Sequence, residues 1–290
     1  MMQVIVSGLI VGCVYGLAAL GLVLIYKTTD VINFAHGEIG MVSTYVSFFL
    51  LSAAGLHYGL SFFLALIFSA LLGMLIYLVV MKRVQQAPHL HQMVVTLALF
   101  LILNGAAGFI WGHHPTDYPE AIKGAPLKIG GVYVTPHEIF VACLTLILMG
   151  AFFVLFRYTR IGLAMQAASQ DRTAARLMGI KVTQVNMMSW MIGAVLGAVA
   201  GVLTAPLVLL SLNMMMTILI MAFAAAVLGG FVSLVGAVVG GLIIGVFENL
   251  ISFYIAPELK LVYTFALIVL MLYIRPQGIL GGGKKAVKKV

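Results

Sequence analysis

The sequence predicts an all-α protein that crosses a membrane about eight or nine times. Of its 290 residues, 63% are hydrophobic and only 8% are charged, whereas soluble domains carry roughly 25% charged residues. The mean hydropathy is +1.17, and apolar runs long enough to span a bilayer recur along the chain. We therefore expect a single transmembrane domain over residues 1–290, without a separate soluble domain.

The first half of the chain contains four candidate membrane segments. They are residues 4–26, 39–51, 60–81 and 93–111, the last interrupted by Asn104-Gly105. Residues 4–26 carry no charge, and glycines recur near helical spacing at 8, 12, 16 and 21. Such a face allows another helix to approach closely.

Residues 112–137 form the longest polar connection in the first half, and we assign them to the periplasmic side. Their charges are mixed, with Asp117, Glu120, Lys123 and Lys128. Alternating residues flank Gly130-Gly131, a two-residue signal for a β-hairpin. Residues 138–156 then predict a crossing back to the inside.

Residues 158–183 predict a cytoplasmic segment with a short amphipathic helix over 162–178. Arginines and one lysine outnumber its single acid, Asp171, and such positive bias marks the cytoplasmic side. Leu163, Ala175 and Leu177-Met178 belong to the expected apolar stripe, and Gly179 is suited to end the helix. The segment fits a groove in another protein, or alternatively lies on the inner leaflet.

The second half begins with an uncharged run over 182–247, long enough for roughly three spans. Pro206 with 211–213, and Gly229-Gly230 with Ser233, are the expected breaks. Residues 259–274 predict the last span, and residues 276–290 a basic cytoplasmic tail. Counting every run gives nine spans with the N-terminus outside; one re-entrant run, such as that after Glu38, would give eight with it inside. Broken segments after Asn33 and around 229–241 are weakly consistent with inverted repeats.

The polar stretch from Asn33 to Glu38 is the strongest candidate for a functional site. Asn33, His36, Gly37 and Glu38 are a poor fit to a membrane helix, and polar or irregular segments at that depth line cavities or are buried in protein. We expect a helix break beside a substrate path. An amide or helix N-terminus suits a substrate carboxylate, and the Glu38 carboxylate suits an ammonium group. One alternative is a short interfacial loop with a helix N-cap at Asn33. Another is that these residues only hold the broken helix by hydrogen bonds.

Other site classes find little support. The His89/His91 and His113/His114 pairs match no metal-ligand spacing and lack an accompanying Cys or carboxylate, so we expect no metal. The net charge of +8 is concentrated in cytoplasmic clusters and does not indicate nucleic-acid binding. The sequence contains no phosphate-binding loop for ATP.

Four stretches together resemble one transporter family. They read GCVYGLAALGLVLIY followed by VINFAHGEIGMVSTYVSF, RYTRIGLAMQAASQDRTAARLMGI, AAAVLGGFVSLVGAVVGGLIIG, and RPQGILG. In this order and over nearly the whole chain, they resemble the LivH-type permease subunit of high-affinity branched-chain amino acid ABC transporters.

The resemblance implies a non-catalytic subunit of an ATP-driven importer for leucine, isoleucine and valine in the bacterial inner membrane. Its implied partners are a second homologous permease, two cytoplasmic ATP-binding subunits, a periplasmic solute-binding protein and membrane lipid. ATP would be bound by the partners, and this chain would need no cofactor. The resemblance also implies that the ATPase-coupling residues are Gly162, Asp171, Ala175, Leu177, Met178 and Gly179.

Three alternatives remain at this stage. Related permeases for urea, short amides or other amino acids share much of the motif set. An ion-coupled secondary transporter would need buried acids, for which only Glu38 and Glu248 qualify. A structural subunit of a respiratory complex is disfavoured because no paired histidines for haem stand within the spans.

Overall fold

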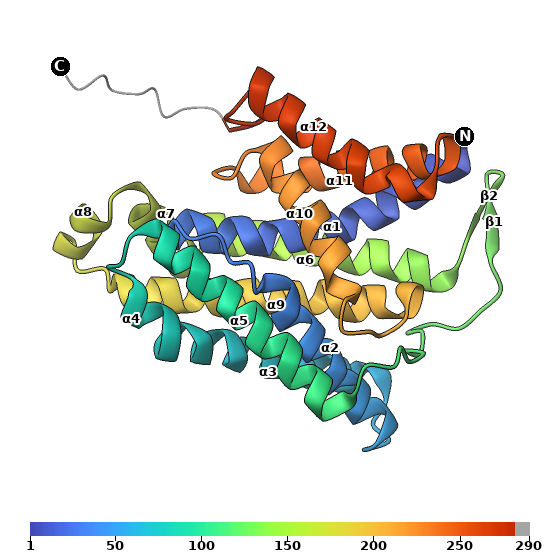
Figure 1. Cartoon of the computed structure of the whole chain (residues 1–290), viewed down its shortest axis with the longest axis horizontal. Coiled ribbons are helices and arrows are strands. Elements are labelled where there is room, and N and C mark those ends of the chain that lie inside the picture. Colours follow the sequence, from blue (N-terminus) through green and yellow to red (C-terminus); the bar gives the residue numbers. More distant parts are fainter. Residues whose placement is uncertain (282–290) are drawn as a thin grey trace.

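The computed structural model describes residues 1–281 and confirms the all-α architecture (Figure 1). Among these residues, seven helices are long and apolar enough to cross a membrane. They are α1 (Met2–Thr29), Tyr58–Val84, α5 (His89–Trp111), α6 (Pro136–Tyr158), α9 (Val182–Val208), α11 (Leu234–Tyr254) and Pro257–Ile274. Tyr58–Val84 joins α3 (Tyr58–Ile76), a π-helical turn and α4 (Lys82–Val84), and Pro257–Ile274 contains α12 (Lys260–Ile274).

Two shorter helices complete the bundle. They are α2 (His36–Ser52), with 17 residues, and α10 (Met214–Gly229), with 16. At 1.5 Å per residue each is roughly 25 Å long, less than the roughly 30 Å hydrocarbon core. Each follows a non-helical segment, residues 30–35 or residues 209–213, which we name the first break and the second break. A break and its helix together make one crossing, so the described chain makes nine.

The two ends of the bundle are distinct. At the hairpin end, β1 (Leu127–Ile129) pairs antiparallel with β2 (Val132–Val134) around Gly130-Gly131, which confirms the predicted hairpin. The Gln3 side chain donates to the Tyr133 carbonyl at 2.7 Å and accepts from its N–H at 2.8 Å, so the N-terminus lies at this end.

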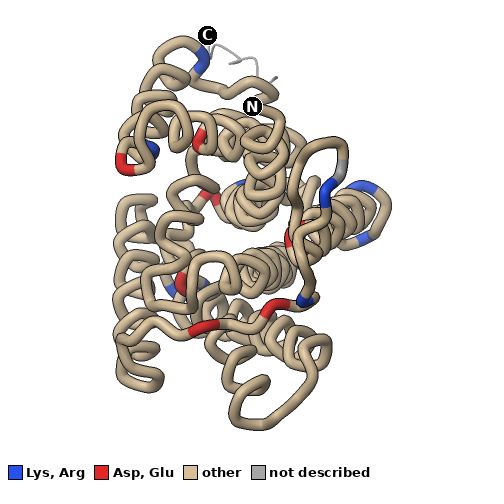
Figure 2. The backbone as a smooth tube through the Cα atoms, turned by 90° about the vertical axis from the view of Figure 1, so that its right-hand side faces the viewer, with Lys and Arg blue, Asp and Glu red and all other residues tan. Residues whose placement is uncertain are grey.

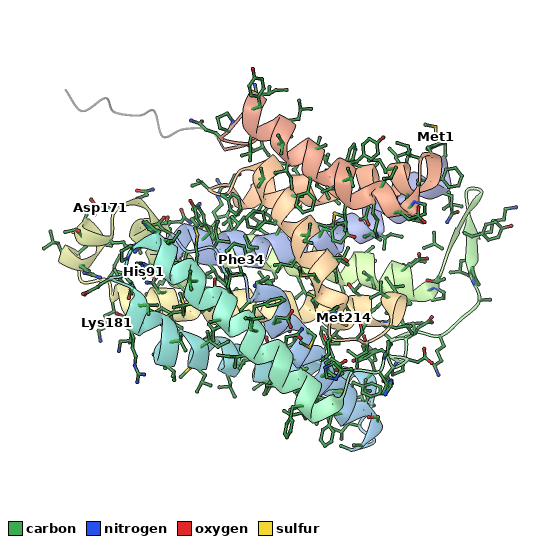
Figure 3. All side chains as sticks on the ribbon, in the orientation of Figure 1. Met1, Phe34, His91, Asp171, Lys181 and Met214 are labelled. Atoms are coloured by element: carbon green, nitrogen blue, oxygen red, sulfur yellow. The ribbon has the colours of Figure 1, made fainter. Side chains whose placement is uncertain are left out.

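The opposite end, which we name the α8 end, carries α7 (Arg160–Gln170) and α8 (Arg172–Leu177). The chain after α12 returns there, where the Ile279 N–H donates to the Leu228 carbonyl at 2.8 Å. Figure 3 shows Met1 at the opposite end from Asp171 and Lys181. Because the N-terminus and the end of α12 lie at opposite ends, the structure agrees with nine crossings and not with eight. Residues 282–290 of the predicted tail lie outside the described residues.

Helices α1 and α9 form the centre of the bundle. A Cβ added at Gly21 in α1 would lie 3.0 Å from the Gly193 carbonyl of α9, and one added at Gly12 would lie 2.9 Å from the Gly241 carbonyl of α11. Lipid gives apolar helices little hydrophobic reason to associate, so close backbone approach is an important source of packing energy. Viewed from the hairpin end, the tube carries few charged residues (Figure 2).

Three expectations need correction. Helix α5 is continuous through Asn104-Gly105, because helices tolerate one glycine and the Asn104 amide bonds to neighbouring segments rather than to its own backbone. The expected helix over 162–178 is divided into α7 and α8 at Asp171, whose φ of −151° is not helical. The counterpart of the first break is the second break, not residues 229–241, which hold the α10–α11 turn and the start of α11.

Candidate functional site

The first break is buried and tied down by side chains. Asn33 and His36 are 0% and 1% exposed, and Asn33 Oδ1 accepts a hydrogen bond from the Ala35 N–H at 3.1 Å. From α5, Thr96 Oγ1 donates to the Ile32 carbonyl at 3.2 Å and accepts from the Phe34 N–H at 3.4 Å. These contacts satisfy part of the polar backbone that the break exposes inside the bundle.

Glu38 lies in the first turn of α2 and is 1% exposed. Its Oε2 accepts a hydrogen bond from Asn104 Nδ2 at 3.1 Å, and the same nitrogen lies 3.4 Å from the Leu212 carbonyl of the second break. One amide of α5 therefore contacts the first turn of α2 and the second break. Sequence reasoning placed Asn104 at an interruption of a helix and did not identify this role.

His36 and Gly37 pack between helices. A Cβ at Gly21 would lie 2.7 Å from His36 Cε1, and one at Gly197 would lie 3.3 Å from the same atom, so the imidazole occupies space that these two glycines leave free. A Cβ at Gly37 would lie 3.3 Å from the Met215 carbonyl of α10. Both residues thus lie where α2 meets other helices.

The structure therefore brings Asn33, His36, Gly37 and Glu38 together in the interior, where Figure 3 shows Phe34 well away from both ends. None of the four lines either of the two cavities described below. Asn33 and Glu38 make hydrogen bonds there, whereas His36 and Gly37 make packing contacts, so the role of holding the break by hydrogen bonds stays a prediction. Direct contact with substrate stays a prediction.

A cavity of about 440 Å³ lies elsewhere, beside the second break. Its walls come from α1, α6, α9, α10, α11 and the start of α12. Inside it, Glu248 Oε2 accepts a hydrogen bond from the Tyr15 hydroxyl at 2.6 Å, and Lys260 Nζ lies 2.8 Å from Glu248 Oε1. The sequence predicts Glu248 only as a buried acid that an ion-coupled transporter would need, and it predicts no role for Tyr15 or Lys260. We name this space the Glu248 cavity.

The segment predicted to couple to the ATPases lies at the α8 end. Asp171 Oδ1 accepts hydrogen bonds from the Thr173 and Ala174 N–H groups at 2.7 and 3.0 Å, so Asp171 caps α8. The Ala174 and Thr173 N–H groups hold the pKa of the Asp171 carboxyl below its usual range. Gly179, at φ +82°, confirms the predicted helix end, since its N–H and that of Ile180 bond back to the Arg176 and Ala175 carbonyls.

Four of the six predicted coupling residues, Gly162, Ala175, Leu177 and Met178, divide into two groups. Gly162 faces the bundle, because a Cβ there would collide with the Phe156 and Leu155 carbonyls of α6, and Ala175 is 4% exposed. Leu177 and Met178 project outward at 84% and 83% exposed. The expected single stripe is therefore wrong, because Gly162 and Ala175 face the bundle whereas Leu177 and Met178, at the end of α8, project away from it.

Arg172 connects this segment to the first break. Its guanidinium donates to Asp30 Oδ2 at 2.8 Å and to the Thr28 carbonyl at 3.1 Å. Asp30 is the left-handed residue, at φ 57°, that ends α1 and begins the first break. A second cavity, of about 430 Å³ and lined by Arg172, Asp30, Lys27 and Gln92 among others, lies beside this contact.

Comparison with known proteins identifies the family. The profile of the family described as "Branched-chain amino acid transport system / permease component" matches residues 4–272. The chain belongs to this family of permeases. It is therefore a membrane permease component, with multiple spans.

Several relatives are similar over the full length of the permease. The high-affinity branched-chain amino acid transport system permease protein LivH of Salmonella typhimurium is 32% identical, covering 100% of this chain and 97% of the relative. The corresponding protein BraD of Pseudomonas aeruginosa is 30% identical, with 100% and 98% covered. A probable LivH of Methanocaldococcus jannaschii is 31% identical, with 94% and 90% covered. No solved structure matches the permease significantly.

Proposed function

We propose that this permease imports leucine, isoleucine and valine across the bacterial inner membrane. The observation that carries the proposal is its similarity, over its full length, to relatives named as high-affinity branched-chain amino acid transport permeases. We further propose that it works beside a second homologous permease, with two cytoplasmic ATP-binding subunits and a periplasmic solute-binding protein. ATP would be bound by those subunits, and this chain would bind no cofactor.

The distribution of charge supports an orientation with the α8 end in the cytoplasm. Basic residues at that end, in chain order, are Lys27, Lys82, Arg83, Arg157, Arg160, Arg172, Arg176, Lys181 and Arg275. At the hairpin end, Lys123, Lys128 and Lys260 are accompanied by Asp117, Glu120, Glu138 and Glu258. An excess of Lys and Arg marks cytoplasmic loops, so residues 112–137 would be periplasmic and the C-terminus cytoplasmic.

The outward tip at Leu177 and Met178 supports ATPase docking by residues 158–183. Two apolar side chains more than 80% exposed beside a capped turn form a compact knob suited to a groove. The Arg172–Asp30 contact offers a route from this knob to the end of α1. Movement of the knob on closure of the ATPase dimer would then reach the first break, and alternating access would follow from rocking of the helices around it.

Competition uptake tests the function. We would delete the permease, restore it in trans, and measure radiolabelled leucine uptake against excess isoleucine, valine, alanine and urea. We expect restored uptake that isoleucine and valine block and that ATP depletion abolishes. Rescue of urea or amide uptake instead would contradict the proposed substrate and leave the family assignment unchanged. Uptake that follows membrane potential rather than ATP would contradict the ATP-driven mechanism.

The coupling assignment has its own test in the assembled importer. We expect Gly179→Pro to abolish stimulated ATP hydrolysis, because proline cannot adopt the positive φ of this position. Gly55→Pro is the matched control, since Gly55 has φ +63° in the α2–α3 turn at the hairpin end. Unchanged stimulated hydrolysis in Gly179→Pro would contradict the docking role.

A further inference from the structure

The Glu248 cavity lies part of the way into the membrane from the hairpin end. Glu248 is six residues from the end of α11 at Tyr254, or roughly 9 Å at 1.5 Å per residue. Lys260 begins α12, and Val208 and Asn213 flank the second break. The volume of about 440 Å³ falls in the range of small-molecule sites, roughly 300–1,000 Å³.

Its polar side combines one negative and one positive group. The Glu248 side chain is 7% exposed, and the Lys260 side chain is 35% exposed. The Tyr15 hydroxyl holds the other Glu248 oxygen, which fixes the carboxylate and leaves the Lys260 contact as the exchangeable one. The Asn249 side-chain nitrogen donates to the Gly245 carbonyl at 3.1 Å, so the side-chain oxygen Oδ1 of Asn249 is available to a ligand.

Its other side is aliphatic. Ile10 and Val14 of α1, Val141 of α6, Leu207 of α9 and Ile218 of α10 line the cavity. Polar sites in membrane proteins are costly and mark functional pathways, whereas a purely structural ion pair has no need of an adjoining apolar space. A net-neutral ligand with both charges and an aliphatic group would match all three features.

We propose that the Glu248 cavity binds the free α-amino acid during its passage through the permease. This assignment rests on the proposed function and names the side chains that recognise the substrate. The ammonium group of the amino acid takes the place of Lys260 at Glu248 Oε1. The substrate carboxylate pairs with the displaced Lys260 ammonium, and the branched side chain lies against the aliphatic wall.

Charge complementarity distinguishes this ligand from the alternatives. A lipid phosphate or another simple anion would meet the Glu248 carboxylate, and a simple cation would meet Lys260. A neutral amide such as urea would leave both charges without an ionic partner. Only a ligand that carries both charges replaces the Glu248–Lys260 contact on each side.

A cysteine-protection experiment tests the assignment. Ser252 lines the cavity, so Ser252→Cys in the assembled importer in membrane vesicles places a thiol there. Its rate of modification by a small charged thiosulfonate would be measured with leucine, with 4-methylpentanoate, which lacks the ammonium, and with 3-methylbutylamine, which lacks the carboxylate. Tyr133→Cys places a thiol on the exposed hairpin, outside the membrane spans and outside the cavity, and this variant serves as the control.

We expect leucine to slow modification of Ser252→Cys severalfold, with little effect of either single-charge analogue and no effect of leucine on Tyr133→Cys. Adding Glu248→Gln or Lys260→Met should remove the protection, whereas Glu258→Gln, at an exposed carboxylate two residues before Lys260, should retain it. Lys260→Met keeps the test decisive if Glu248→Gln fails to assemble, because the Lys260 side chain is partly exposed.

Three results would overturn the assignment: no protection in vesicles that import leucine, equal protection by all three compounds, or protection that persists in Lys260→Met. Leucine uptake measured in the same vesicles separates this assignment from the proposed function. Vesicles that fail to import leucine would contradict the proposed function, while protection by leucine in them would still support a zwitterion site.

Discussion

The first break, between α1 and α2, and the second break, between α9 and α10, have the same layout but different surroundings. Each follows a central helix of 28 or 27 residues, contains a non-glycine residue with positive φ (Asp30 at 57°, Leu209 at 69°), and precedes a short helix. Helices α1 and α9, which lead into the two breaks, run in opposite directions through the bundle, as Figure 1 shows. This arrangement is that of inverted repeats around a central region.

The surroundings separate their roles. The first break and the first turn of α2 are enclosed, with Asn33, His36 and Glu38 at most 1% exposed and with hydrogen bonds donated by Thr96 and Asn104 of α5. The second break opens onto the Glu248 cavity through Asn213, whose side chain makes no capping hydrogen bond. The chain thus contains two similar helix breaks. The first is buried and held by neighbouring side chains, and the second lines a cavity.

The largest expected effect tests whether the first break is fixed. Gly21→Val would add side-chain atoms where a Cβ already lies 2.7 Å from the His36 ring and 3.0 Å from the Gly193 backbone. We expect a loss of roughly 3 kcal/mol of stability or failure to assemble, since overpacking strains a filled core. Thermal unfolding in detergent measures it. Gly105→Val is the matched control, because nothing lies within 4 Å of a Cβ there. Equal stability of the two variants would mean that the helices around the first break shift to accommodate a larger side chain at position 21.

The second effect concerns the contact through which Asn104 links the start of α2 to the second break. Asn104→Ala removes the amide between Glu38 and the Leu212 carbonyl and leaves a buried carboxylate without this partner. We expect a loss of about 1–3 kcal/mol in unfolding free energy. Ile102→Ala, at an exposed position of the same helix, is the control for truncation in α5. A loss no greater than that of Ile102→Ala would show that the breaks are independent.

The third effect concerns the loop over residues 112–126, which contacts both α2 and the second break. Tyr118 bonds to Ser47 of α2 at 2.7 Å, and Thr116 exchanges backbone hydrogen bonds of 3.0 and 2.9 Å with Leu210 in the second break. We expect Tyr118→Phe to cost about 1 kcal/mol and to increase proteolysis within residues 112–126. Tyr133→Phe, at a ring that is 56% exposed, should leave proteolysis unchanged.

The same tyrosine predicts a response to alkaline pH. Burial raises the pKa of Tyr118 to about 12, above the roughly 10 of an unfolded chain. Its contribution to stability is therefore complete below about pH 10 and is lost as the pH rises towards 12. Proteolysis of the loop should increase in that window in the parent protein and change less in Tyr118→Phe. An identical pH profile in both proteins would contradict the assignment.

The smallest effect is confined to α8. Because the folded pKa of Asp171 is lowered, its cap contributes above the unfolded pKa of roughly 3.9 and is lost as the pH falls through the folded value. Hydrogen exchange should show faster opening of α8 in Asp171→Ala at neutral pH. Asp171→Asn keeps a capping oxygen and should remove the acid dependence without opening the helix. If Asp171→Asn opens α8 as much as Asp171→Ala does, the charge rather than the cap supports the helix.

Much of the fold was predictable because the signals are local. The apolar runs located the crossings, Gly130-Gly131 the hairpin, and Gly179 the end of α8. The excess of basic residues between 157 and 181 predicted that this whole segment lies at one end of the bundle. Each of these depends on a few neighbouring residues and on their interaction with backbone, water or membrane.

The sequence by itself determined the helices, their turns and the family to which the permease belongs. The break near 211–213 was predicted from the sequence, but only the tertiary structure decided that it is the counterpart of the first break. It also decided that Tyr15 meets Glu248 across 233 positions and that Asn104 links the start of α2 to the second break. In a membrane protein, lipid and the interior are similarly apolar, so the pattern of hydrophobic residues says little about which helix face is buried. Close contacts between glycine backbones fix those faces, and they do so through the partner helix rather than through the neighbouring sequence.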